Sequence, residues 1–143
     1  TMKFRYNPNR LGGNMKARAW LAFVGILTLV LVGCRTNPVD NVEGAPVSTS
    51  TPAYNLRDVR DAIQQAGVSL GWQMKDVKPG LIVGTLVLRD HVAQIDIPYN
   101  RTSYSIIYRD SQNLNYDGVN IHSNYNGWIQ RLNGAINAQL SRL

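Results

Sequence analysis

Hydrophobic positions divide the chain into three parts. An uncharged and mostly apolar run covers residues 19–32, and residues 35–53 contain three prolines and no apolar periodicity. From residue 54 onward, helical spacing and strand-like alternation follow each other. This pattern predicts one folded domain of about ninety residues behind a leader and a linker.

Two amphipathic helices are predicted, one at each end of this domain. The first begins after a capping Asn55 and runs to Gly67, with apolar residues at helical spacing: Leu56, Val59, Ile63 and Ala66. The second begins near Asn124 and carries an apolar residue every fourth position: Trp128, Leu132, Ile136 and Leu140. Each helix therefore has one face that needs a hydrophobic partner.

Between the helices, four apolar or alternating segments predict β-strands: residues 68–74, 81–89, 92–99 and 102–109. The reversals between them are short, so neighbouring strands must be antiparallel. The polar residues 111–123 are expected to form a loop. The predicted fold class is α+β: a helix, a four-stranded antiparallel meander and a helix, in a two-layer sandwich with both helices on one sheet face.

The beginning of the chain has the pattern of a secretion signal, which we assign to residues 1–33. Residues 15–18 (MKAR) are basic, and the run at 19–32 follows them. As a helix, this run would span roughly 21 Å, which is shorter than the roughly 30 Å hydrocarbon core of a bilayer. The polar residues before Met15 fit such a signal poorly, so translation is expected to begin near Met15.

The apolar run ends in Leu31-Val32-Gly33-Cys34, which resembles the cleavage site of bacterial lipoproteins. The resemblance implies cleavage before Cys34 and acylation of Cys34 by palmitate-type chains. Two or three chains make a stable anchor, since each buried methylene contributes about 0.8 kcal/mol. By analogy with lipoprotein sorting, Arg35 at the next position favours the outer membrane. The alternative is an ordinary buried thiol behind a hydrophobic N-terminal helix.

Charge and linker composition refine this picture. Five basic residues precede Cys34, which leaves ten Lys and Arg against nine Asp and Glu in the remainder, so no nucleic-acid partner is expected. Cys34 is the only cysteine, so the domain has no internal disulfide. Residues 34–54 are interpreted as the lipidated cysteine and a flexible tether with a reach of roughly 25 Å.

Conventional catalytic and cofactor motifs are absent from the sequence. It contains no phosphate-binding glycine loop, zinc-protease helix motif, paired-cysteine motif or nucleophile elbow. We therefore predict no catalytic residue, no cofactor and no metal. The two histidines, His91 and His122, could form a zinc site only with carboxylates, and a structural role is simpler for both. Asp96 is expected to pair with Arg89 or Arg109 across the sheet.

Residues 111–128 combine asparagines with aromatic rings, which is the chemistry that carbohydrate or peptide backbones require. The competing interpretation is that asparagine and Asp-Gly only form turns. Tyrosines of the strand at 102–109 are expected on an open sheet face, where they would add to a partner or dimer contact. The candidate binding residues are Tyr104, Tyr108, Asn113, Tyr116, His122, Tyr125 and Trp128.

Several short strings of the domain together resemble a family of small, uncharacterised proteobacterial lipoproteins. They include Arg89-Asp90-His91, Tyr104-Ser105-Ile106, Asn113-Leu114-Asn115-Tyr116 and Trp128-Ile129. The resemblance implies an envelope location and a compact α+β domain over residues 55–143, and it carries no catalytic residue.

The function expected from these observations is that of an outer-membrane lipoprotein facing the periplasm. It would bind or assemble an envelope component, with the membrane, an envelope protein, peptidoglycan or a second copy of the chain as partners. The first alternative is a cell-wall glycan-binding module. The second is a small periplasmic hydrolase that uses His122 with Asp117 or Asp96.

Overall fold

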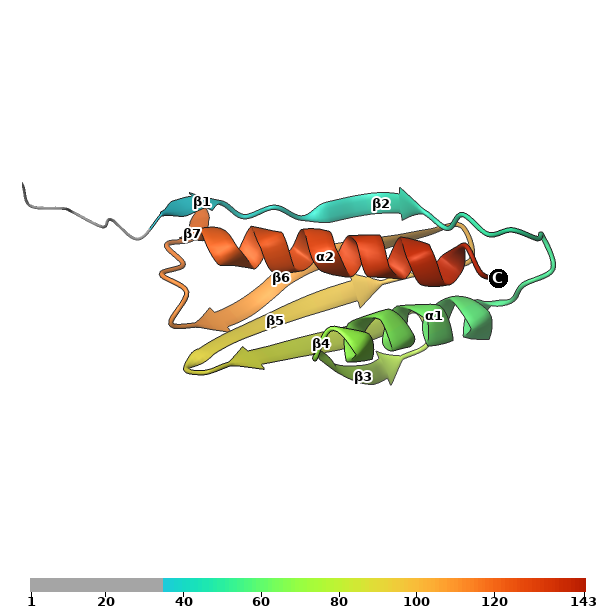
Figure 1. Cartoon of the computed structure of the whole chain (residues 1–143), viewed down its shortest axis with the longest axis horizontal. Coiled ribbons are helices and arrows are strands. Elements are labelled where there is room, and N and C mark those ends of the chain that lie inside the picture. Colours follow the sequence, from blue (N-terminus) through green and yellow to red (C-terminus); the bar gives the residue numbers. More distant parts are fainter. Residues whose placement is uncertain (1–34) are drawn as a thin grey trace, which may run out of the picture. The chain divides into compact units, whose positions relative to one another are not determined.

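The computed structural model describes residues 35–143. The predicted signal segment, the start near Met15 and Cys34 lie outside the described residues. The elements follow the order β1 (Thr36–Pro38), β2 (Val42–Pro46), α1 (Leu56–Ser69), β3 (Gln73–Lys78), β4 (Leu81–Leu88), β5 (His91–Pro98), β6 (Ser103–Gln112), β7 (Asn120–His122) and α2 (Ser123–Leu140) (Figure 1). The α+β class is confirmed.

Helix α1 begins where the sequence predicts, and it continues two residues further. Asn55 forms a capping box with Asp58, in which each side chain accepts a hydrogen bond from the other residue's backbone amide. Gly67 does not end the helix as expected. Gly67 packs directly against Met74. A Cβ at position 67 would come within 2.4 Å of the Met74 sulfur. The chain reverses instead at Gly71, whose φ of +86° suits glycine.

The main sheet has five antiparallel strands in the order β2-β6-β5-β4-β3, and not four. Strands β3 to β6 form the predicted meander, although β3 starts five residues later than expected because α1 uses residues 68 and 69. Strand β2 pairs with β6, with Val42 opposite Ile106 and Ala45 opposite Tyr104. The turn between β4 and β5 is formed by Arg89 and Asp90, one residue earlier than expected.

Part of the predicted tether therefore belongs to the folded domain. Residues 36–46 contribute β1 and β2. In the predicted loop, residues 120–122 form β7, which pairs with β1. Strands β1 and β7 are each only three residues long. Each forms because the other supplies hydrogen-bond partners for its backbone N–H and C=O groups.

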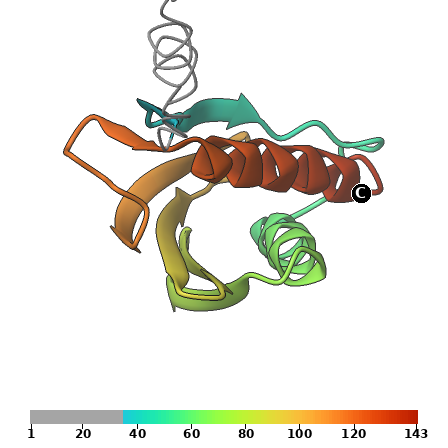
Figure 2. The same ribbon diagram turned by 60° about the vertical axis from the view of Figure 1, so that its left-hand side comes forward.

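Both helices lie on the inner face of a strongly curved sheet, and Figure 2 shows them inside its curve. Alternate residues of β4 and β5 point to this face and are buried with the apolar stripes of the helices. Tyr104 and Tyr108, expected on the open face, are on the inner face instead. Tyr108 pairs with the fully buried Ile95, and Tyr104 is 1% exposed. Among residues 35–143, neither helix covers the opposite face of the sheet (Figure 2).

Candidate functional site

Three of the seven predicted binding residues belong to the core. Tyr104 is covered by α2, where its hydroxyl lies 2.6 Å from Oδ1 of Asn133 and 2.9 Å from Oδ1 of Asn137. Tyr125 is 0% exposed and Trp128 is 9% exposed. These three side chains stabilise the fold, and a ligand reaches at most the edge of Trp128.

The other four predicted residues meet at one end of the domain, close to the β4–β5 turn. The Tyr108 ring packs against Tyr116 with centroids 4.2 Å apart, and the edge of Tyr125 packs against Tyr108 at 5.8 Å. The rings of His91 and His122 are 6.2 Å apart. Asn113 donates a hydrogen bond from its side chain to the carbonyl of Asp90, 2.6 Å away. We call His91, Tyr108, Asn113, Tyr116 and His122 the end cluster.

The histidines of the end cluster hold the backbone in place. His122 is the N-cap of α2, and its Nδ1 accepts a hydrogen bond from the amide of Asn124 at 3.2 Å. Nδ1 of His91 lies 2.9 Å from the carbonyl oxygen of Asn113. Both contacts agree with the structural roles favoured from the sequence.

The carboxylates considered for a hydrolase are also engaged, and they are not gathered at His122. Asp96 accepts a hydrogen bond from Arg109 at 2.8 Å on the outer face of the sheet, which confirms the expected cross-strand pair. Asp117 accepts from the backbone amides of Val119 and Asn120, and these hydrogen bonds lower the pKa of its carboxyl group. The contacts of Asp96 and Asp117 named here are thus with residues other than His122.

The loop that carries Asn113 and Asn115 has the turn chemistry of the competing interpretation. Both residues adopt positive φ angles, 57° and 51°, which asparagine tolerates better than most residues. Among residues 35–143, no group of three or more histidines, cysteines or carboxylates is placed to hold a metal ion. In the same part of the chain, neither helix is long and apolar enough to cross a membrane.

The outer face of the sheet contains a hollow that the sequence analysis did not single out. Its volume is about 350 Å³, and its lining comes from all four strands of the meander: Gln73, Met74, Lys75, Val77, Val83, Thr85, Gln94 and Arg109. Two rows of facing residues cross it, one from Gln73 through Thr85 to Gln94 and one from Lys75 through Val83 to Asp96. Amide, hydroxyl, aliphatic and charged groups thus alternate on one surface.

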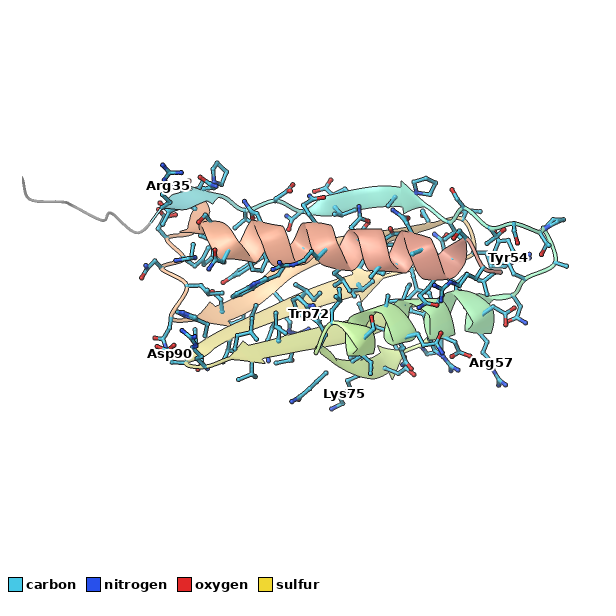
Figure 3. The ribbon with its side chains drawn as sticks, in the orientation of Figure 1. Arg35, Tyr54, Arg57, Trp72, Lys75 and Asp90 are labelled. Atoms are coloured by element: carbon cyan, nitrogen blue, oxygen red, sulfur yellow. The ribbon has the colours of Figure 1, made fainter. Side chains whose placement is uncertain are left out.

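A second hollow, of about 340 Å³, lies at the end of the domain opposite the end cluster, between the start of α1 and β3 (Figure 3). Leu56, Val77, Pro79 and Tyr99 give it apolar walls, and the charged residues at it are Arg57, Arg60, Asp76 and Lys78. Arg60 also pairs with Asp61 at 2.7 Å. Helix spacing alone could not reveal this hollow, because it depends on how β3 passes the first turn of α1.

Raising the pH above 10 is expected to destabilise the domain. Burial raises the pKa of Tyr104 to about 12, and it also raises the pKa of Tyr125, whose hydroxyl has no hydrogen-bond partner among the described residues. In the unfolded chain both phenols ionise near pH 10, so the unfolded state releases protons first. The contribution of the two tyrosines to the free energy of unfolding is therefore fully present below pH 10. It falls toward pH 12, by at most about 1.4 kcal/mol per pH unit for each tyrosine.

Urea unfolding between pH 8 and pH 11.5 measures this effect. Tyr104→Phe should lower the midpoint at pH 8 and reduce its fall at high pH, since one of the two ionisations is removed. A midpoint that stays constant to pH 11.5 in the parent protein would contradict the expectation.

Comparison of the chain with models of protein families, with curated proteins and with solved structures gave no match. The resemblance to small lipoproteins therefore stays a prediction. The class that the fold of residues 35–143 defines is a small α+β domain with both helices on one face of its main sheet.

Proposed function

We propose that the protein is an acylated lipoprotein of the bacterial outer membrane that faces the periplasm and binds another envelope protein without catalysing a reaction. The sequence Leu31-Val32-Gly33-Cys34 behind a short apolar run supports the anchor. The observation that supports binding is the hollow on the outer face of the sheet, on the side away from α1 and α2 (Figure 2).

The chemistry of this hollow suits a polypeptide surface. Val77 and Val83 provide apolar contact, and Val77 is largely exposed. Gln94 and Thr85 offer donors and acceptors beside them, and Arg109 is held in position by Asp96. A mixture of apolar contact and fixed polar groups is typical of protein interfaces.

A glycan is the less favoured ligand for this face. Sugars stack on aromatic rings, and none of the residues that line the hollow is aromatic. The aromatic residues expected to supply such rings lie instead in the core or in the end cluster. A second copy of this chain is a protein partner, so a homodimer is compatible with the proposal.

In-cell photo-crosslinking tests the proposal. A photoreactive amino acid at Val83 should give a protein adduct of discrete mass, and the same probe at Ser141, which is exposed beyond the end of α2, should not. Thr85→Arg should reduce the Val83 adduct at least several-fold, because Thr85 lies next to Val83 in the hollow. An adduct of twice the chain mass identifies the homodimer.

Two results would contradict a protein partner at this face. One is an adduct pattern that is the same from Val83 and Ser141. The other is retention of the chain on purified peptidoglycan sacculi that is lost with Thr85→Arg, which would assign the face to glycan instead.

A further inference from the structure

The described chain begins in direct contact with the folded domain. The carbonyl of Arg35 accepts a hydrogen bond from the amide of Ser123 at 2.9 Å, and Thr36 pairs with His122. Cys34 is therefore covalently joined to a residue that the domain already holds. One residue spans at most about 3.6 Å, so acyl chains on Cys34 would draw this end of the domain, and not the other, toward a bilayer.

The same end carries the β4–β5 turn and the loop at residues 113–119. Figure 3 shows Arg35 and Asp90 at one end of the domain and Tyr54 and Arg57 at the other. The hydrogen bond between Asn113 and Asp90 joins the loop to the turn. The hydrogen bond from the amide of Val39 to the carbonyl of Val119, 3.0 Å long, joins the loop to the segment after β1.

Exposed apolar side chains gather in these two segments. Val119 is 65% exposed, Leu88 43% and Tyr116 41%. Leu88 pairs with His91 at the β4–β5 turn, and the ring of Tyr116 packs against that of Tyr108. We call Leu88, Tyr116 and Val119 the apolar end.

We propose that the apolar end is a membrane-docking surface that contacts the lipid headgroup and acyl boundary beside the acylated Cys34. The proposal rests on the proposed acylation, since the acyl chains bring this end to the bilayer. Aliphatic side chains gain free energy on leaving water, and tyrosine is favoured at the interface of a membrane because its ring is apolar and its hydroxyl is polar.

Electrostatic attraction is not the expected driving force for this contact. The charged residues of the β4–β5 turn, of the loop at 113–119 and of the position before β1 balance each other: Arg35 and Arg89 against Asp90 and Asp117. Docking should therefore depend only weakly on ionic strength, in contrast to binding by a basic patch.

Docking in this way would also orient the domain. Helix α2 begins beside Arg35 and is 18 residues long, so its other end lies about 27 Å away. The outer face of the sheet follows the same long axis (Figure 1). The hollow proposed to bind a partner would thus stay accessible from the periplasm.

The test uses the full chain, purified from membranes and reconstituted in vesicles of phosphatidylethanolamine and phosphatidylglycerol. Val119→Cys, Leu88→Cys and the control Thr51→Cys each introduce one thiol for a fluorescent label, because an acylated Cys34 does not react. Thr51 is exposed and its hydroxyl bonds to the carbonyl of Leu143, so it reports on the end without Arg35. Quenching by nitroxide-labelled lipids should be at least fivefold greater at positions 88 and 119 than at position 51.

Three outcomes would overturn the proposal, and they are distinguishable. Equal quenching at the three positions, in protein whose mass includes the acyl chains, would overturn the docking and leave the proposed anchor intact. A mass with a free Cys34 thiol would overturn the anchor and the docking together. Quenching at positions 88 and 119 that falls several-fold between 0.05 and roughly 1 M salt would also contradict the contact, because salt screens charges and leaves apolar burial intact.

Discussion

A chain that lacks residues 36–46 is expected to be unfolded. The deletion removes β1 and β2 and uncovers the edge of β6 and the buried Ile121 of β7. It also removes three residues that pack against the core: Val39, Val42 and Ala45. Burial of an aliphatic side chain contributes about 1.5–3 kcal/mol, so the loss is comparable with the roughly 5–15 kcal/mol that keeps a domain folded.

Circular dichroism and urea unfolding measure this loss, and two point variants refine it. Val42→Asp places a charge at a half-buried position opposite Ile106 and should lower the free energy of unfolding by about 2–3 kcal/mol. Glu43→Ala, at the next and exposed position, should change it by less than about 0.5 kcal/mol. A deletion variant with the parent spectrum and midpoint would show that this segment is only a tether.

Replacing Cys34 by alanine is expected to abolish incorporation of a palmitate analogue and to remove the mature protein from the outer-membrane fraction. Cys34 is the only thiol in the chain, so no other residue can take the sulfur-linked acyl chains. In the proposed lipoprotein, two or three acyl chains on Cys34 supply the free energy that holds the protein on a bilayer, and the alanine variant would lack the sulfur-linked ones.

Thr36→Ala is the matched control for this change. Thr36 is exposed and contributes to β1 through its backbone pairing with His122, so the variant should remain acylated and in the outer-membrane fraction. Palmitate labelling that persists in Cys34→Ala at the level of the parent would contradict the assignment of the anchor.

The parts of the fold that could be predicted are those whose signal is local. Asn55 and Asp58 cap α1 through contacts within three residues, and the meander follows from alternating segments joined by short turns. Strands β2 and β7 could not be predicted in this way. Each is short, and its partner is far away in the sequence, as with Thr36 and His122.

Which side chains of β6 face outward depends on the register between β5 and β6, and this register cannot be derived from the sequence pattern. The helices were correctly expected on the Ile95 side of the sheet. Tyr108 lies on that side because it pairs with Ile95, and the irregularity between Gln94 and Ile95 leaves Arg109 as the extra residue on β6. A shift by one residue exchanges the two faces of a strand, so the tyrosines were placed on the wrong face.

The hollow on the outer face escaped prediction for a related reason. Its residues come from four strands, and five of the eight are polar or charged: Gln73, Lys75, Thr85, Gln94 and Arg109. Such a pattern indicates only a solvated face. The two hollows and the end cluster become visible once the strands are aligned side by side.

The proposal that an acylated Cys34 joins the bilayer to a domain that begins one residue later can be decided by one mass. The N-terminal peptide of the protein, purified from the outer membrane of its native host, is expected to begin at Cys34 and to carry two or three acyl chains. A peptide that extends upstream of Cys34 and has a free thiol would contradict it.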